Sequence, residues 1–558
     1  MTADAPPGPR PFLLASLLWL VVGVAMGGFF ATNPGFRALK HTGHDFELVF
    51  ASVHSHINLL GWLSNALFAL VYWVLPRVFS RPLYSPRLAA WHFWLLNVGL
   101  AGMMAALFAG GVAGARVLIA GRESPDPGAA LYGPGNAYLP YEAFLSLLRW
   151  GIPFAVLVLL GAGAFAANVW LTFGLRPSLA RLANRARERF PLPARLAGLA
   201  AVPEEGPVEH PALKWMLKVA ALWLVAGILL GGLYGSPPMF RWLKEGGFDF
   251  ESMFASVHSH MTVMGWLGGG LLAVLFGVAL LENRPPPARG LRVFLWLYNL
   301  GLLGLLAFLA VAAYQGRAAF VGATGDLTEA ERFHPFEVSQ GVLRFALPFA
   351  LLFAAGLAAA VAALWRRLPG DPWAARFLRA GMAWLAAGLA LEGILSLDPI
   401  YFWLVRSGHE FTIMQVVVKD HMVMLGGLSG IAFGLLYGLV PRLSPGRGGT
   451  PSPSPLPSAG PPPPPSRMWN PGLVAAHFWL LNIGLGGFLL FYAWGGYAGG
   501  GVFQTASNPY GPGGYLPYLA ALDVTRFGTP FALALAASLI LFFIHTWRIW
   551  PRDPPEER

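Results

Sequence analysis

The sequence predicts an all-α membrane protein whose twelve transmembrane helices form three four-helix repeats related by a pseudo-threefold axis. Two observations predict this fold: an apolar composition, and a pattern that recurs three times along the chain. Hydrophobic residues make up 56% of the 558 residues and charged residues only 12%. Such a composition is typical of a chain in a lipid bilayer. The stretches 12–31, 89–112, 213–235 and 472–495 reach the roughly 20 apolar residues that a spanning helix needs.

The second helix of each repeat carries the most distinctive motif. Phe50–His56 reads Phe-Ala-Ser-Val-His-Ser-His, and Phe254–His260 has the same sequence. Val416–His421 is an altered third copy, in which Lys419 replaces the first histidine and His421 keeps the second. Ionisable side chains at membrane depth are costly, so we expect these residues to have a ligand, a partner or a cavity.

The third and fourth helices recur as well. The third helix carries an aromatic motif that ends in asparagine, and the fourth begins with an arginine that precedes a proline. Three repeats of four helices account for twelve spans. The asparagines are Asn97, Asn299 and Asn482, and the arginines are Arg149, Arg344 and Arg526.

The repeats set the expected domain boundaries. Repeat 1 covers 11–175, repeat 2 covers 212–368, and repeat 3 covers 376–442 and 468–550. A basic linker, 176–211, joins the first two repeats, and a proline- and serine-rich loop, 443–467, interrupts the third. We expect both connections to lie extended or disordered at the cytoplasmic surface.

The placement of arginine predicts the topology. Arginines gather after the even-numbered helices, and positive residues prefer cytoplasmic loops, so we expect a multi-pass protein of the plasma membrane with both termini in the cytoplasm. The formal charge of +11 is then mostly a topology signal, and no nucleic-acid partner is expected. The chain has no cysteine, which excludes disulfides, thiolate-bound copper, iron–sulfur clusters and covalently attached haem c. A cysteine-free chain rich in arginine and proline also hints at a thermophile.

The spacing of the paired histidines limits their chemistry. Residues two apart on a helix point about 200° away from each other, so His54 and His56 are expected to serve different sites, as are His258 and His260. This spacing disfavours a single-metal chelate, which needs both rings on one helix face. An imidazole on a rigid apolar helix suits the iron of a haem that is buried between neighbouring helices.

Several motifs together resemble a known family. Leu60–Trp62 follows the first histidine pair, Leu75–Arg77 comes further along, and the next helix includes Trp91–Trp94. This series resembles the tenth and eleventh helices of subunit I of the haem-copper oxidase superfamily, and it is most similar to the C-type cytochrome oxidases and nitric oxide reductases. That family also has twelve helices in three pseudosymmetric groups of four, so the resemblance extends over nearly the whole chain.

The resemblance implies ligand positions. The two histidines of the family's low-spin haem match His54 and His421. The proximal histidine of its high-spin haem falls on Lys419. One ligand of its copper or non-haem iron matches His260, and the place of an adjacent histidine pair is taken by Phe308–Leu309. A conventional centre for reducing oxygen or nitric oxide is therefore not expected, and copper is not expected.

Threefold rotation of the first ligand pair gives two further pairs. We predict two haem b groups with two histidine ligands each, and a third pair that either holds a third haem with unusual ligation or is empty. All five histidines of these pairs are candidate metal ligands. The pairs, in this order, are His54/His421, His56/His258 and Lys419/His260.

Three arginines that begin the fourth helices have two possible roles. Arg149, Arg344 and Arg526 begin their helices at the expected outer surface, where haem propionates point in the resembling family. They would pair with propionates or simply anchor their helix ends, and both roles are weighed equally. His92 and His477 are expected to be hydrogen-bonded structural residues.

The resemblance implies electron transfer through haem, with oxygen or nitric oxide reduction or quinol oxidation at a non-standard site. The expected partners are the lipid bilayer, cytochrome c or quinol as electron donor, and other respiratory subunits. Two alternatives stay open. One is a non-enzymatic haem-based gas sensor or an assembly factor that handles haem or copper. The other is a transporter that binds protons or metal ions at its buried histidines.

Overall fold

The structure is a computed structural model. It describes residues 9–31, 35, 39, 42–133, 138–175, 180–182, 184–185, 203, 210–323, 329–443, 470–506, 510–511 and 514–549. The all-α prediction is confirmed. Over this part of the chain, twelve helices are long and apolar enough to cross a membrane. Its only strands are the two-residue β1 (Tyr510–Gly511) and β2 (Gly514–Tyr515), which pair in antiparallel fashion.

The chain divides into two compact units. Unit 1 comprises Met1–Trp19 and Arg37–Arg367, and unit 2 comprises Leu20–Phe36 and Leu368–Arg558. The boundary therefore falls inside α1 (Arg10–Ala31). The three-repeat division with its listed boundaries stays a prediction. Most of the linker 176–211, and all but the first residue of the loop 443–467, lie outside the described residues.

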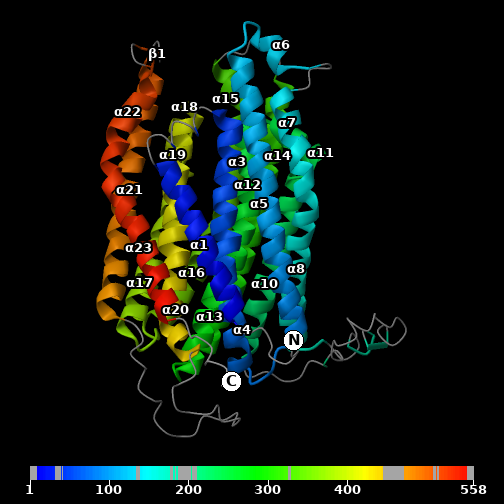
Figure 1. Ribbon diagram of the computed structural model, residues 1–558, viewed down its shortest axis with the longest axis vertical. Coiled ribbons are helices and arrows are strands. Elements are labelled where there is room, and N and C mark those ends of the chain that lie inside the picture. The colour runs from blue at the N-terminus through cyan, green and yellow to red at the C-terminus, as the bar shows by residue number, and fades with distance from the viewer. Residues whose placement is uncertain are drawn as a thin grey trace, which may run out of the picture. The chain divides into compact units, whose positions relative to one another are not determined.

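Unit 1 holds most of the first eight spans, and its long helices run lengthwise in Figure 1. In chain order these elements are α3 (Gly43–His56), η1 (Ile57–Ser64), α4 (Asn65–Val78), α5 (Pro86–Arg122), α6 (Pro127–Leu131), α7 (Leu139–Leu148), η3 (Arg149–Gly151), α8 (Ile152–Thr172), α10 (Pro211–Tyr234), α11 (Pro237–Glu245), α12 (Gly247–His260), η4 (Met261–Gly268), α13 (Gly269–Leu281), α14 (Ala288–Gly322), α15 (Glu329–Leu343), η5 (Arg344–Ala346) and α16 (Leu347–Trp365).

Unit 2 holds the last four spans, with the short strands β1 and β2 before its final span. Its helices are α17 (Pro372–Leu395), α18 (Asp398–Arg406), α19 (His409–His421), η6 (Met422–Ser429), α20 (Gly430–Leu443), α21 (Pro471–Thr505), α22 (Leu516–Thr525), η7 (Arg526–Gly528) and α23 (Thr529–Ile549).

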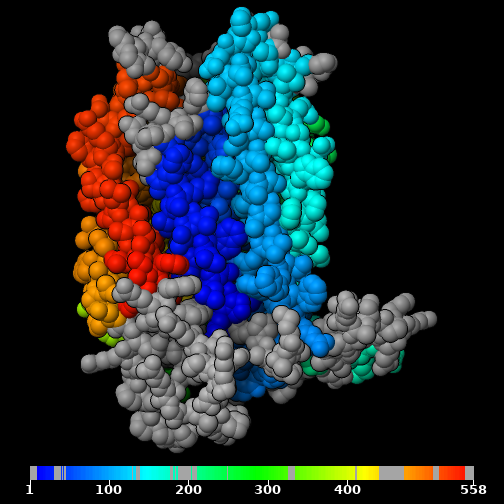
Figure 2. All heavy atoms as spheres, in the orientation of Figure 1, coloured from blue at the N-terminus to red at the C-terminus, as the bar shows by residue number. Residues whose placement is uncertain are grey.

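The histidine-bearing spans are the most buried. In the spans Phe46–Val78, Asp249–Leu281 and Phe411–Gly438, 94%, 89% and 72% of the most apolar window is buried, against 28–39% in the other nine described spans. A helix that is apolar all round belongs in a core. By contrast α5, which forms a column on the visible face of unit 1 in Figure 2, leaves Trp91 and Trp94 more than half exposed, as lipid-facing side chains would be.

Each of these three central spans changes its helical geometry after the second histidine of the motif. The α-helix ends at His56, His260 or His421, and a π-helical segment of eight residues follows. Such π segments are rare and are frequently found at functional sites. The resulting shift in register changes which side chains face the neighbouring helices beyond the histidines.

A glycine inside each π segment allows a tryptophan to pack closely. A Cβ added to Gly61 would lie 2.6 Å from the Cγ atom of Trp19, and one added to Gly265 would lie 2.5 Å from that of Trp223. The indole N–H of Trp19 donates to Asn97 Oδ1 at 2.9 Å, and that of Trp223 donates to Asn299 at 2.9 Å. Gly426, Trp384 and Asn482 make the same set of contacts in unit 2.

Candidate functional site

His56 and His258 meet inside unit 1. His56 is the last residue of α3, and His258 lies near the end of α12. Their ring centroids are 6.1 Å apart, and the ring planes differ by only 19°. Sequence reasoning predicted this pair of residues, and the structure brings them together from positions about two hundred residues apart.

Backbone carbonyls orient both rings. His56 Nδ1 lies 2.7 Å from the Ser52 carbonyl oxygen of its own helix, and His258 Nδ1 lies 2.7 Å from the Gly227 carbonyl oxygen of α10. Because a carbonyl oxygen only accepts, each Nδ1 carries the proton and donates. The Nε2 atom of each neutral ring then keeps its lone pair, which is the arrangement of a metal-binding histidine.

The ring separation fits a metal held between the two imidazoles. With a metal–nitrogen bond of about 2 Å on each side and about 1 Å from each nitrogen to its ring centre, two imidazoles across one metal have centroids about 6 Å apart. The 6.1 Å separation agrees with that value. A metal would lie between them if their Nε2 atoms faced each other, and the role of His56 and His258 as haem ligands stays a prediction.

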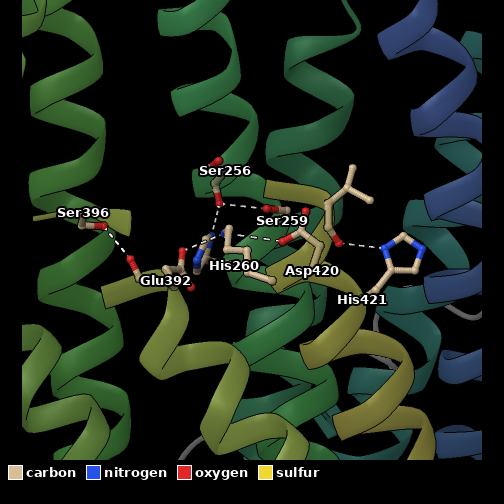
Figure 3. Close-up of polar contacts among 9 residues, drawn as sticks. Ser256, Ser259, His260, Glu392, Ser396, Asp420 and His421 are labelled. Carbon is tan, nitrogen blue, oxygen red and sulfur yellow. Dashed lines mark hydrogen bonds and ion pairs between the residues drawn. The ribbon is translucent and has the colours of Figure 1, made fainter. Parts of the chain in front are cut away.

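His260 and His421, like His56, donate to the carbonyl oxygen four residues earlier in the same helix. His260 Nδ1 donates to the Ser256 carbonyl oxygen at 2.7 Å, and the Ser259 hydroxyl donates to the same oxygen at 3.1 Å (Figure 3). His421 Nδ1 donates to the Val417 carbonyl oxygen at 2.9 Å.

His54 differs, because the Asn58 amide nitrogen lies 3.4 Å from both of its ring nitrogens. The pairs His54/His421 and Lys419/His260 each join residues of the two units, and these pairings stay predictions.

Lys419 forms a strong ion pair within unit 2. Its Nζ atom lies 2.9 Å from Glu392 Oε1 on α17 and 3.4 Å from Asp420 Oδ1. The Lys419 side chain is only 13% exposed and the Glu392 side chain 29%. In Figure 3, Glu392 lies beside Ser396, whose hydroxyl donates to its backbone carbonyl. The sequence alone did not indicate that Glu392 is the partner of Lys419.

The three candidate propionate-binding arginines lie at exposed positions. Arg149, Arg344 and Arg526 begin the short 3₁₀ turns η3, η5 and η7. An exposed aromatic residue follows each of them, and the Arg526 guanidinium lies 5.1 Å from the Phe527 ring centre. These positions favour anchoring at a membrane interface, where amphipathic side chains gather. The role in binding propionates stays a prediction.

Two further histidines, expected to be structural, are buried and hydrogen-bonded. His92 and His477 are fully buried among aromatic rings. The Tyr72 hydroxyl lies 3.1 Å from His92 Nδ1, and the Tyr437 hydroxyl lies 2.8 Å from His477 Nδ1.

Comparison with known proteins finds relatives of the first part of the chain. Residues 8–162, which include His54 and His56, match the family model described as Cytochrome C and Quinol oxidase polypeptide I. The chain is 32% identical over 161 residues to cytochrome c oxidase subunit 1 of Rhodobacter capsulatus, a match that covers 28% of each protein.

Two homologues of that subunit also match. The one from Agrobacterium tumefaciens (strain T37) is 31% identical over 161 residues, which is 27% of this chain and 28% of the relative. The one from Bradyrhizobium diazoefficiens, a bacteroid form, is 30% identical over 100 residues, which is 17% of this chain and 18% of the relative. The matched regions thus span less than a third of each relative. With the twelve spanning helices, these matches support a divergent multi-pass membrane protein that is similar to haem-copper oxidase subunit I.

Proposed function

We propose that this protein carries electrons across part of the plasma membrane through haem b groups that are each held by two histidines. The observation that supports this most directly is the His56/His258 pair, with centroids 6.1 Å apart and ring planes within 19° of parallel. His54 and His421 would hold a second haem in the same way. Haem b supplies a one-electron carrier whose potential depends on its ligands and surroundings.

Hydrogen bonds from His56 and His258 to backbone carbonyls support their proposed role as haem ligands. The Gly227 carbonyl fixes the orientation of the His258 ring, and the Ser52 carbonyl fixes that of His56. Ligating histidines usually donate their second N–H in this way, which raises the basicity of the ligand.

The catalytic part of the proposal is a non-standard site. Where the resemblance implies a pair of metal-binding histidines on the seventh helix, Phe308 packs on Phe345 and Phe349, with ring centroids 6.4 and 5.6 Å apart. An aromatic ring cannot bind a metal as imidazole does. We propose that oxygen or nitric oxide reduction, or quinol oxidation with cytochrome c or quinol as donor, uses a different ligand set.

We further infer that the chain consists of three four-helix repeats, with both termini in the cytoplasm. The contacts that support this recur three times: a tryptophan of the first helix packs on the glycine of a π segment and donates to an asparagine of the third helix. Such recurrence is expected of repeated structural units. The basic connections after even-numbered helices support the orientation.

The test is the haem content of the purified protein and of two variants. The pyridine haemochrome assay is expected to find haem b, and His56→Ala and His258→Ala are each expected to lose one haem while keeping the other. His334→Ala is the control, because His334 is an exposed histidine at the start of the eighth span. A colourless protein, or variants with unchanged haem content, would contradict the proposal and favour the transporter reading. A carbon monoxide shift would reveal an open iron and favour gas reduction or sensing.

A further inference from the structure

The predicted repeats differ at one position of their first helix. Gly231 precedes His258 by 27 residues, and Glu392 precedes Lys419 by the same number. Gly227 and Gly388, four residues earlier, are glycine in both repeats, which supports this register. The third repeat therefore differs from the second at both members of a pair: glycine and histidine are replaced by glutamate and lysine.

Gly231 lies directly against the His258 ring. A Cβ added to Gly231 would lie 2.5 Å from His258 Cε1 and 2.9 Å from both ring nitrogens. Real Cβ atoms do not approach that closely, so any larger residue would displace the imidazole. The displacement would also break the hydrogen bond from His258 Nδ1 to the Gly227 carbonyl. The absence of a side chain at position 231 is thus a condition for the ring orientation.

Glu392 plays the opposite part in unit 2. Its carboxylate lies 2.9 Å from Lys419 Nζ, in a pair whose side chains are mostly buried. An ammonium group has three N–H donors and no lone pair, so it cannot bind a metal while this pair holds the proton. A carboxylate at membrane depth stabilises the charged lysine, because separating the two charges there is costly.

We propose that the residue at this first-helix position decides whether a repeat provides a haem ligand. Glycine admits the imidazole, as Gly231 does for His258. A glutamate at this position forms a mostly buried ion pair with a lysine, as Glu392 does with Lys419, and the paired lysine cannot bind a haem iron. The inference rests on the proposed haem site, and it answers the open question of the third pair: Lys419 is not a ligand and the protein carries no third haem through it.

The first experiment compares two neighbouring glycines. Gly231→Ala is expected to lose the His56/His258 haem, which is about half of the haem of the protein. Gly232→Ala is the matched control, because a Cβ there meets nothing within 4 Å. The remaining haem and the melting temperature show that the Gly231→Ala protein is folded. Retention of the full haem content in Gly231→Ala would overturn the inference.

The second experiment moves the ion pair into unit 1. His258→Lys alone leaves a buried amine without a carboxylate and is expected to lower the melting temperature. The double variant Gly231→Glu/His258→Lys is expected to recover much of that loss, and to lack one haem. A double variant no more stable than His258→Lys would contradict the inference.

The outcomes separate this inference from the proposed function. A wild-type protein without haem, or one whose haem is unaffected by His56→Ala, would refute the proposed haem site itself. A wild-type protein that loses one haem in His56→Ala but none in Gly231→Ala would leave the haem site intact and refute only the role of position 231.

Discussion

At the scale of single residues, the imidazoles are held by short hydrogen bonds to backbone carbonyls. His56, His258, His260 and His421 all donate from Nδ1 to such an oxygen, at 2.7–2.9 Å. His56, His260 and His421 bond to the carbonyl oxygen four residues earlier in their own helix, whereas His258 bonds to Gly227 of α10.

The Lys419–Glu392 ion pair leads to a prediction about stability. Glu392→Ala leaves a mostly buried ammonium whose remaining carboxylate partner among the described residues of the unit is Asp420, at 3.4 Å. Breaking a buried pair by removing one partner costs about 3 kcal/mol, so we expect a clear drop in melting temperature in detergent. Asp523→Ala is the control, because its pair with Arg526 is about 70% exposed and such pairs contribute less than about 1 kcal/mol. Equal effects of the two substitutions would show that Lys419 is not buried as described.

The Tyr72–His92 hydrogen bond gives a second prediction at this scale. Tyr72→Phe removes the hydroxyl from a fully buried imidazole, which costs about 1–3 kcal/mol. The corresponding place in repeat 2 holds Phe276 and Phe294, whose rings pack at 6.0 Å. The double variant Tyr72→Phe/His92→Phe is therefore expected to be more stable than Tyr72→Phe alone, by thermal unfolding. A double variant that is less stable would show that the imidazole has a second role.

At the scale of elements, the π segments and their glycines join the first three helices of each predicted repeat. The sequence showed that an asparagine recurs in each expected third helix, and in the structure Asn97 accepts a hydrogen bond from the Trp19 indole of the first helix. It did not predict the π geometry. Apolar residues fill both helical forms of these central spans, so their pattern does not distinguish an α segment from a π segment.

The close contact of Gly265 with Trp223 can be tested. Gly265→Ala places a Cβ 2.5 Å from Trp223 Cγ, and overpacking of this kind costs about 1–3 kcal/mol. Gly269→Ala is the matched control, because its nearest contacts are at 3.9 Å. We expect Gly265→Ala to lower the melting temperature and to alter Trp223 fluorescence, whereas Gly269→Ala leaves both unchanged. Identical behaviour of the two variants would refute the close packing.

At the scale of the whole molecule, the number of spans and the pairing of His56 with His258 were predictable. Length and apolar composition determine the spans, and the repeated motif indicated which residues would meet. The exposure of the candidate arginines and the partner of Lys419 were not predictable in the same way. Both depend on which helix faces lie together, and that follows from the packing of many side chains. The sequence shows that Glu392 of the third predicted repeat takes the place of Gly231 of the second. Only the contacts of these two residues show what that difference does to the side chain opposite.

The central claim is that His56 and His258 share one haem iron with nearly parallel ring planes. The most direct test is electron paramagnetic resonance of the oxidised purified protein, compared with His258→Ala. Near-parallel axial imidazoles on ferric haem give a rhombic low-spin signal, so the 19° angle predicts such a signal in the wild-type protein. The contribution of this haem is expected to be lost in the variant, which keeps the signal of the second haem. The absence of any low-spin haem signal, or a rhombic signal that persists unchanged in His258→Ala, would contradict the account.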